Sequence, residues 1–109
     1  MTTIATVRRY CLGLPEVVEL PHHGIPSFRV AKKIFATVPD SEHLHVMLGE
    51  DEVEDMIAVA PSSFEKLFWG QQLAGVRVHL DAADRRLVTW ALDKAWRRRA
   101  PARLIKPTN

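Results

Sequence analysis

The stretch PSFRVAKKIFATVPDSEHLHVML, residues 26–48, decides the fold. Residues 26–30 and 33–38 are rich in β-branched and aromatic side chains, and the two residues between them, 31–32, predict a tight hairpin. Residues 43–48 then place an apolar side chain at every second position, which is typical of a strand with one buried face. The stretch therefore predicts three strands that follow one another along the chain.

Helical periodicity flanks these strands on both sides. Apolar residues recur at steps of three and four in residues 3–13, 50–60 and 82–99, and this spacing predicts three helices. The last helix is the clearest, and we expect Asp81 to cap it, with Asp84 three residues later in a capping-box position.

Two more strands are expected between the second and third helices. Residues 76–80 alternate between apolar and polar side chains, and residues 66–71 predict a short edge strand. Residues 15–25, rich in Pro, His and Glu, predict an irregular connection. The expected order is therefore helix, three strands, helix, two strands and helix.

The chain of 109 residues is long enough for one small domain and too short for two. We expect residues 1–106 to form that domain and residues 107–109 to be a loose tail. Cys11 is the one cysteine, which excludes an intrachain disulfide, and its place on an apolar helix face indicates a buried side chain. No apolar run approaches the ~20 residues of a membrane helix, so we expect a cytoplasmic protein with no membrane partner.

Charge is unevenly distributed along the chain. Residues 40–55 carry seven acidic and no basic side chains, whereas residues 85–109 carry eight basic side chains against Asp93 alone. If folding keeps these segments apart, the basic end is an electrostatic footprint for a polyanion such as nucleic acid. The alternative is a solvated helix face followed by a solubilising tail.

Trp90 lies off the apolar face of the last predicted helix. It falls on the opposite half of the helical wheel, one turn from Arg86 and Lys94 and two turns from Arg97. An outward indole ringed by cations suits stacking on a base while the cations hold phosphates. The alternative is a Trp that packs over the rim of the sheet or against another subunit.

Histidines form the other candidate cluster. His43 and His45 share one strand face and His79 points outward from another strand, so neighbouring strands would bring three imidazoles together as in a zinc site. The alternative is three surface histidines on a solvated sheet face. His22 and His23 lie between prolines, where structural hydrogen bonding competes with a role as ligand or general base.

Enzyme signatures are absent from the sequence. It contains no glycine-rich phosphate loop, no GxSxG elbow and no HExxH helix. The serines have no sequence neighbour that would activate them. We therefore expect no catalytic residue, no metal and no cofactor.

One segment carries a family resemblance. LPHHGIPSFRV at residues 20–30, followed by KIFA at 33–36, resembles the PHxGxPSFRV…KIFA signature of the MmcQ/YjbR-like family. Residues 76–81, VRVHLD, and the later AWR and APARL segments resemble its last strand and its SYR…APKRL ending. Ala102 stands where the family usually has Lys, and the Trp that often precedes the last strand is missing.

This resemblance implies an α+β fold of two layers, an antiparallel sheet covered by helices in the order α-β-β-β-α-β-β-α, sometimes described as a double wing. It also implies similarity to the DNA-binding domain of a phage transcription factor and to secretion-chaperone folds. DNA binding is proposed for the family by analogy of fold.

Together, the charge pattern and the resemblance predict a small binding module, not an enzyme, whose partner is DNA or RNA. The basic C-terminal helix and a basic sheet face would supply phosphate contacts and base stacking. The expected residues are Arg29, Arg77, Arg86, Trp90, Lys94, Arg97, Arg98, Arg99 and Arg103.

Two alternatives stay open. The first is a protein-interaction module, chaperone-like or homodimeric, with no role on nucleic acid. Its interface anchors would be Phe35, Trp69 and Trp90. The second is an enzyme or small-ligand protein, which would use His22, His23 and Arg29 around a deep pocket.

Overall fold

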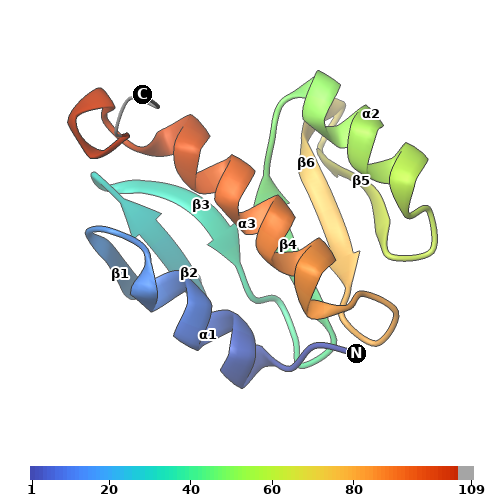
Figure 1. The fold of residues 1–109 in the computed structure, drawn as a ribbon, viewed down its shortest axis with the longest axis horizontal. Coiled ribbons are helices and arrows are strands. Elements are labelled where there is room, and N and C mark those ends of the chain that lie inside the picture. The colour runs from blue at the N-terminus through green and yellow to red at the C-terminus, as the bar shows by residue number, and fades with distance from the viewer. Residues whose placement is uncertain (106–109) are drawn as a thin grey trace.

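The computed structural model describes residues 1–105, which form three α-helices and six strands (Figure 1). In chain order the elements are α1 (Ile4–Gly13), β1 (Val17–His22), β2 (Ile25–Val30), β3 (Lys33–Thr37), β4 (His43–Met47), α2 (Glu50–Val59), β5 (Phe64–Trp69), β6 (Gln72–His79) and α3 (Arg85–Arg99). A short 3-10 helix, Ala102–Leu104, follows α3.

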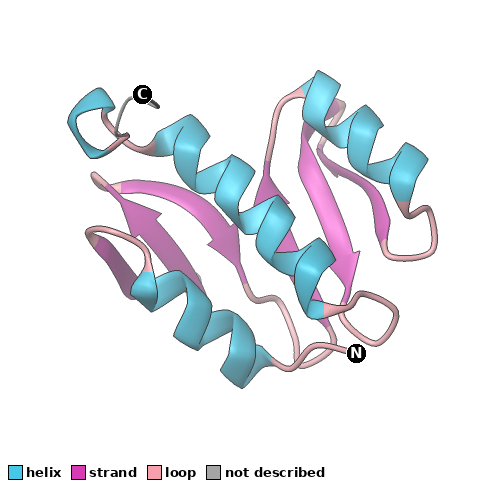
Figure 2. Ribbon diagram, viewed as in Figure 1, coloured by secondary structure: helices cyan, strands magenta, loops and turns pink. Residues whose placement is uncertain are grey.

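The strands form one antiparallel sheet in the order β1-β2-β3-β4-β6-β5. β3 and β4 pair only at Ala36↔Val46 and Thr37↔His45, and the sheet opens into two halves there (Figure 1). α1 packs on β1, α2 packs on β5 and β6, and α3 lies over the junction against β3 and β4 (Figure 2). The predicted α+β class and two-layer antiparallel arrangement are confirmed.

The irregular connection expected at residues 15–25 is wrong, because β1 forms there. It pairs with β2 along its whole length, through a tight turn in which His23 and Gly24 have φ values of 51° and 81°. Proline argues against a strand at residue 21, but β1 is an edge strand, where Pro is tolerated at positions whose N–H side faces solvent. The sheet therefore has one strand more than the sequence predicts.

The hairpin predicted at residues 31–32 is confirmed. Ala31 and Lys32 join β2 to β3 with φ values of 52° and 68°. A two-residue turn with positive φ at both positions matches the right-handed twist of the flanking strands. Neither residue is Gly or Asn, so strand pairing on both sides holds the turn in this conformation.

The cap of α3 is Asp84 rather than the predicted Asp81. The Asp84 carboxylate accepts the backbone N–H of Leu87 at 2.9 Å, and the helix begins at Arg85. Asp84 has an extended backbone, with φ −79° and ψ 172°, so residues 82–83 lie before the helix in a turn whose N–H groups donate to the carbonyl oxygen of His79.

The core lies between the sheet and the helices. Phe28, Phe35 and Leu44 from the strands are fully buried, and the apolar face predicted for α3 is buried against them. Cys11 is buried as predicted, and its burial raises the pKa of the thiol to about 12. None of the helices in the described chain is long and apolar enough to span a membrane.

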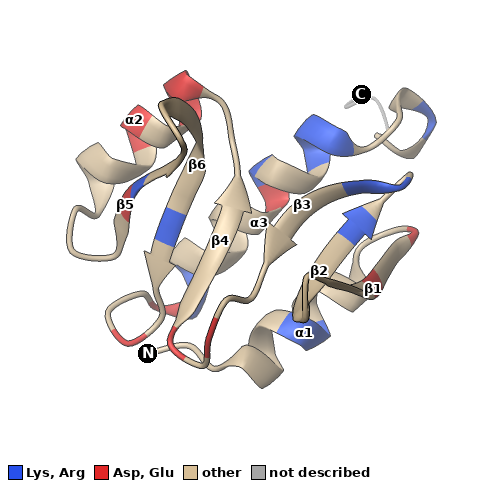
Figure 3. Cartoon of the chain, turned by 180° about the vertical axis from the view of Figure 1, so that it is seen from behind, with Lys and Arg blue, Asp and Glu red and all other residues tan. Residues whose placement is uncertain are grey.

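The other face of the sheet is not covered by any helix of residues 1–105 (Figure 3). The alternation predicted for residues 43–48 and 76–80 is confirmed, so polar side chains of β4 and β6 point outward here. The predicted loose tail, residues 107–109, lies outside the described residues.

Candidate nucleic-acid interface

The nine residues expected to bind nucleic acid do not converge on one surface. Arg29 on β2 and Arg77 on β6 belong to the open face of the sheet. The other seven lie in α3 and the segment after it, on the helix side (Figure 3). Because the sheet separates the two groups, each has to be judged by its own surroundings.

Arg77 is engaged by neighbours on the sheet face. Its Nε lies 3.6 Å from the carboxylate of Glu65 on β5, and its Nη1 lies 3.3 Å from Nε2 of His45 on β4. The same Glu65 carboxylate lies 2.9 Å from Nε2 of His79. The charge of Arg77 is therefore opposed by a carboxylate within the sheet.

The outward histidines meet on this face. The rings of His43 and His79 pack edge-to-face across β4 and β6, with centroids 5.0 Å apart, and Nδ1 of His43 lies 2.9 Å from Asp40. Within residues 1–105, no group of three His, Cys, Asp or Glu side chains is arranged to hold a metal ion. Burial and then the charge of Arg77 lower the pKa of His45, which favours its neutral form.

Arg29 is half-buried and tied to the sheet. Its Nε donates to Oγ of Ser27 at 3.2 Å, and the Ser27 hydroxyl donates to the carbonyl oxygen of Leu20 on β1 at 2.7 Å. These bonds hold the guanidinium of Arg29 against β1 and β2.

Arg86, Lys94 and Arg97 lie on the exposed side of α3, as the helical wheel predicts. Among the described residues, none of the three has a carboxylate oxygen within ion-pair distance. At a rise of ~1.5 Å per residue they span about 16 Å of the helix. Three unpaired positive charges thus line one helix face.

Trp90 does not present an open ring. It is half-buried and packs edge-to-face on Phe64, with ring centroids 6.2 Å apart. Of the two predictions for Trp90, packing over the rim of the sheet therefore fits the structure, because α3 directs this side chain toward β5 rather than into solvent.

The last three arginines have separate surroundings. Arg98 reaches the acidic first turn of α2, where its Nη1 lies beside Gly49. Arg103 forms a two-pronged ion pair with Glu16, at 2.6 and 2.8 Å, which lowers the pKa of the Glu16 carboxyl. Arg99 is half-buried, and its Nε has no hydrogen-bond acceptor among the described residues.

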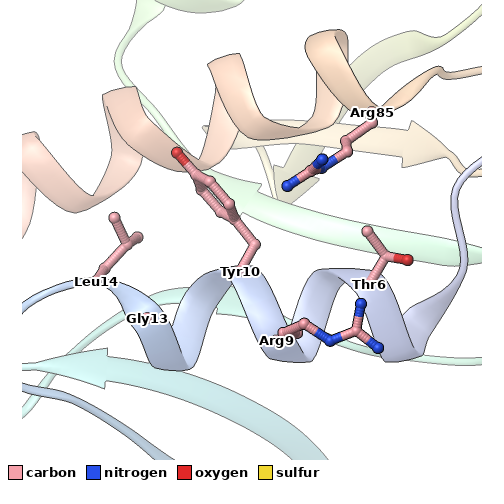
Figure 4. A pocket seen from close by; sticks show the side chains of 6 residues that line it. All are labelled: Thr6, Arg9, Tyr10, Gly13, Leu14 and Arg85. Carbon is pink, nitrogen blue, oxygen red and sulfur yellow. The ribbon is translucent and has the colours of Figure 1, made fainter.

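A groove between α1 and α3 holds two arginines that sequence reasoning missed (Figure 4). It measures about 380 Å³, and Arg9 and Arg85 enter it from opposite helices. Neither forms an ion pair in the described part of the chain. One signal could have found Arg9: the first predicted helix contains basic residues and no acidic one.

Tyr10 lies between the two helices in this groove (Figure 4). Its hydroxyl donates to the carboxylate of Asp93, and burial together with this bond raises the pKa of Tyr10. Asp93 is the one acidic residue of α3, and the bond occupies it. A neutral hydroxyl leaves the charge of the carboxylate in place, so two guanidiniums line the groove and one carboxylate lies beside Tyr10.

Charge separates across the helix layer. α2 contains five acidic residues and no basic one, whereas α1 contains Arg8 and Arg9 and no acidic one. α3 lies between them and carries the basic segment (Figure 3). Folding thus places the acidic α2 on one side of the basic α3 and brings the two into contact at Arg98, so the acidic middle and the basic end are only partly segregated.

Lys32 and Lys33, a second missed pair, lie exposed at the β2–β3 hairpin. The end of α3 is tied to the start of β1, because the indole N–H of Trp96 donates to the carbonyl oxygen of Pro15 at 3.2 Å, two residues before β1. The start of β1 in turn pairs with the end of β2, where the hairpin begins. The hairpin and the C-terminal end of α3 therefore share one basic end of the molecule (Figure 3).

The residues expected to anchor a protein interface differ in their exposure to solvent. Phe35 is wrong as an anchor, because it is fully buried in the core. Trp69 is 61% exposed at the end of β5. The hollow beside the His23-Gly24 turn is lined by Glu19, Leu20, Pro21, Gly24, Ile25 and Pro26, and neither His22 nor His23 lines it.

Comparisons with known proteins bear on the fold. The family model YjbR matches residues 12–98. Among solved structures, the chain is similar to the crystal structure of the Deinococcus radiodurans protein DR2400, described by the domain DUF419, with a TM-score of 0.70 and 21% sequence identity. That match covers 88% of this chain and 77% of the other. A search of curated proteins gives no significant match.

Proposed function

The chain belongs to the YjbR family, and we propose that it binds nucleic acid through the exposed cations of its helix layer. Arg29 and Arg77, on the sheet face, lie outside this interface. The phosphate contacts come from Arg9 on α1 and from Arg85, Arg86, Lys94 and Arg97 on α3.

The observation that carries this proposal is the lack of ion-pair partners, within residues 1–105, for these cations of α1 and α3. Arg8, Arg77 and Arg103 are matched by carboxylates instead, as in the pair of Arg8 with Glu19 at 2.8 Å. Unpaired exposed cations attract an outside polyanion, and each phosphate contact releases a counterion and adds to affinity.

The spacing supports a backbone contact. Arg85 and Arg97 are separated by about 18 Å at ~1.5 Å per residue. Phosphates along one strand of a duplex advance by ~3.4 Å, so the helix spans about five of them. Arg9 adds a cation across the groove, whereas the acidic α2 repels a polyanion on the other side of α3. The favoured path therefore runs along the exposed side of α3, with Arg86 toward the end of α2 and Arg9 toward α1.

Fluorescence anisotropy of labelled duplex and single-stranded DNA and RNA, at about 50 mM salt, tests the proposal. The variant R86Q/K94Q/R97Q removes three α3 cations, and we expect it to lose more than about tenfold in affinity. The control R29Q/K66Q/R77Q removes the same charge from the strands and should bind like the wild type.

Equal weakening of the two triple variants would mean that only net charge matters and would overturn the assignment to α3. Absence of wild-type binding at tens of micromolar protein would overturn the function itself. Circular dichroism and thermal unfolding of both variants establish that each remains folded.

A second candidate, a protein-interaction module, is favoured by β5. This edge strand ends in Phe68 and Trp69, which are 51% and 61% exposed. An edge strand with exposed aromatic side chains suits strand pairing with another chain, a second copy included. Sedimentation velocity at the highest soluble concentration tests the homodimer: a dimer that W69S disrupts supports it, and a monomer removes it.

A further inference from the structure

A cleft lies where the end of α3, the end of β4 and the β5–β6 hairpin meet. At about 200 Å³ it is smaller than the ~300 Å³ at which usual small-molecule pockets begin, so it suits one flat group rather than a whole cofactor. Apolar side chains and two arginines line it. The residues used below are Met47, Leu48, Trp69, Leu73, Arg98 and Arg99.

Arg99 leaves a hydrogen-bond donor without a partner in this cleft. Its Nε is buried, and no acceptor for it is found in residues 1–105. A buried donor that is unsatisfied lowers stability, and a charged donor more so. Guanidinium N–H groups pair best with the oxygens of a carboxylate or phosphate. That Nε has almost no accessible surface, so an anion in the cleft would meet Arg99 through the other N–H groups of its guanidinium.

Trp69 supplies an open aromatic face beside that donor. Its exposed fraction is 61%, whereas Trp96 is 7% exposed and Trp90 packs on Phe64. Aromatic side chains that bind single strands stack on bases and tolerate any sequence. The stacking role that the sequence assigns to Trp90 fits Trp69 better, because only Trp69 combines exposure with neighbouring guanidiniums.

The surrounding charges favour a single phosphate over a long run of them. Arg98 lies beside Arg99, but its guanidinium also faces the carboxylates of the first turn of α2, residues 50–52. Those carboxylates repel a polyanion that continues past the cleft. One nucleotide brings a flat base and one phosphate, which matches Trp69 and Arg99.

We propose that this cleft takes one unpaired nucleotide at the C-terminal end of the α3 interface, with its base on Trp69 and its phosphate on Arg99. The inference rests on the proposed nucleic-acid function. Arg99 lies two residues beyond Arg97 but ~200° round the helix from it, so a strand that lies along α3 enters the cleft by turning over the C-terminal end of the helix. A single strand or a frayed end can supply the nucleotide, whereas a blunt duplex cannot without unpairing.

Anisotropy with a single-stranded oligonucleotide and a blunt duplex of equal length tests this proposal. We expect the wild type to bind the single strand more tightly, and W69L to weaken single-strand binding by about tenfold, the effect of losing one stacked base. W69F should keep most of the affinity. F68L, which changes the neighbouring exposed aromatic, should leave it unchanged, and R99K should weaken it several-fold because Lys lacks the planar guanidinium that pairs with a phosphate.

The outcomes distinguish a failure of the cleft proposal from a failure of the proposed nucleic-acid function. If duplex binding depends on α3 but W69L binds the single strand as tightly as the wild type does, only the cleft proposal is overturned. Equal weakening of both ligands by W69L would also overturn it, since the cleft would then not distinguish an unpaired base. No binding of either ligand by the wild type would overturn the cleft together with the helix-layer function.

Discussion

Gly75 on β6 lies directly against the carbonyl oxygen of Val46 on β4: a Cβ atom at Gly75 would be 1.9 Å from it. Real Cβ atoms do not approach backbone oxygens this closely, so the two strands pair at this point only with glycine between them. We expect G75A to lower the free energy of unfolding by at least ~2 kcal/mol, because the strands must separate.

Urea denaturation of G75A measures this loss. Gly13, at the end of α1, is the matched control, since a Cβ there would meet no atom within 4 Å. G13A should lie within ~0.5 kcal/mol of the wild type. Equal stabilities of the two variants would contradict the close approach of β4 and β6.

Trp96 ties the C-terminal end of α3 to the turn after α1. Its indole N–H donates to the carbonyl oxygen of Pro15 at 3.2 Å, and the side chain is 7% exposed. W96F removes the donor and part of the packed ring, so we expect a loss of about 2 kcal/mol in denaturant unfolding. W69F, at an exposed Trp, should change stability little, and the same loss from both variants would contradict this role.

Cys11 should not react with thiol reagents in the folded protein. Its side chain is fully buried, and a pKa of about 12 leaves about one thiolate in 10⁴ at pH 8. We expect the rate of reaction with a disulfide reagent to follow the population of unfolded protein as urea is added. Reaction at the rate of a free thiol in native buffer would contradict the burial of this residue.

His45 should make the fold less stable in mild acid. Burial and Arg77 hold its pKa below the ~6.5 of an unfolded chain, so below about pH 6.5 the unfolded state takes up a proton that the folded state resists. The free energy of unfolding should therefore fall as the pH drops from 7 through that range. H45Q should flatten this part of the profile, and an unchanged slope in H45Q would contradict the assignment.

The sequence predicts most of the fold because its signals are local. The alternation in residues 43–48 and the apolar face of α3 each depend on side-chain spacing alone, and both are confirmed. β1 escapes prediction because Pro21 is tolerated only on an edge strand, and edge position is a property of the whole sheet. The start of α3 is misplaced because bonds to His79 hold the turn before it.

The candidate site is less predictable, because convergence depends on register and on which face each strand shows. From the sequence Arg77 is expected to be a free cation, but the pairing of β5 with β6 places Glu65 beside it. From the sequence the Trp90 ring is expected to be exposed, but in the fold it packs edge-to-face with Phe64. Arg9 belongs to a helix with basic and no acidic residues, but only the packing of α1 against α3 places it opposite Arg85.

The measurement that tests the central claim most directly is the salt dependence of nucleic-acid affinity. With duplex DNA, the slope of log affinity against log salt should be steeply negative for the wild type, because each phosphate contact contributes about −0.9. R86Q/K94Q/R97Q should be shallower by about 2.7, the share of three contacts. Equal slopes for the two proteins, or no binding by the wild type at about 50 mM salt, would contradict a phosphate-binding surface on α3.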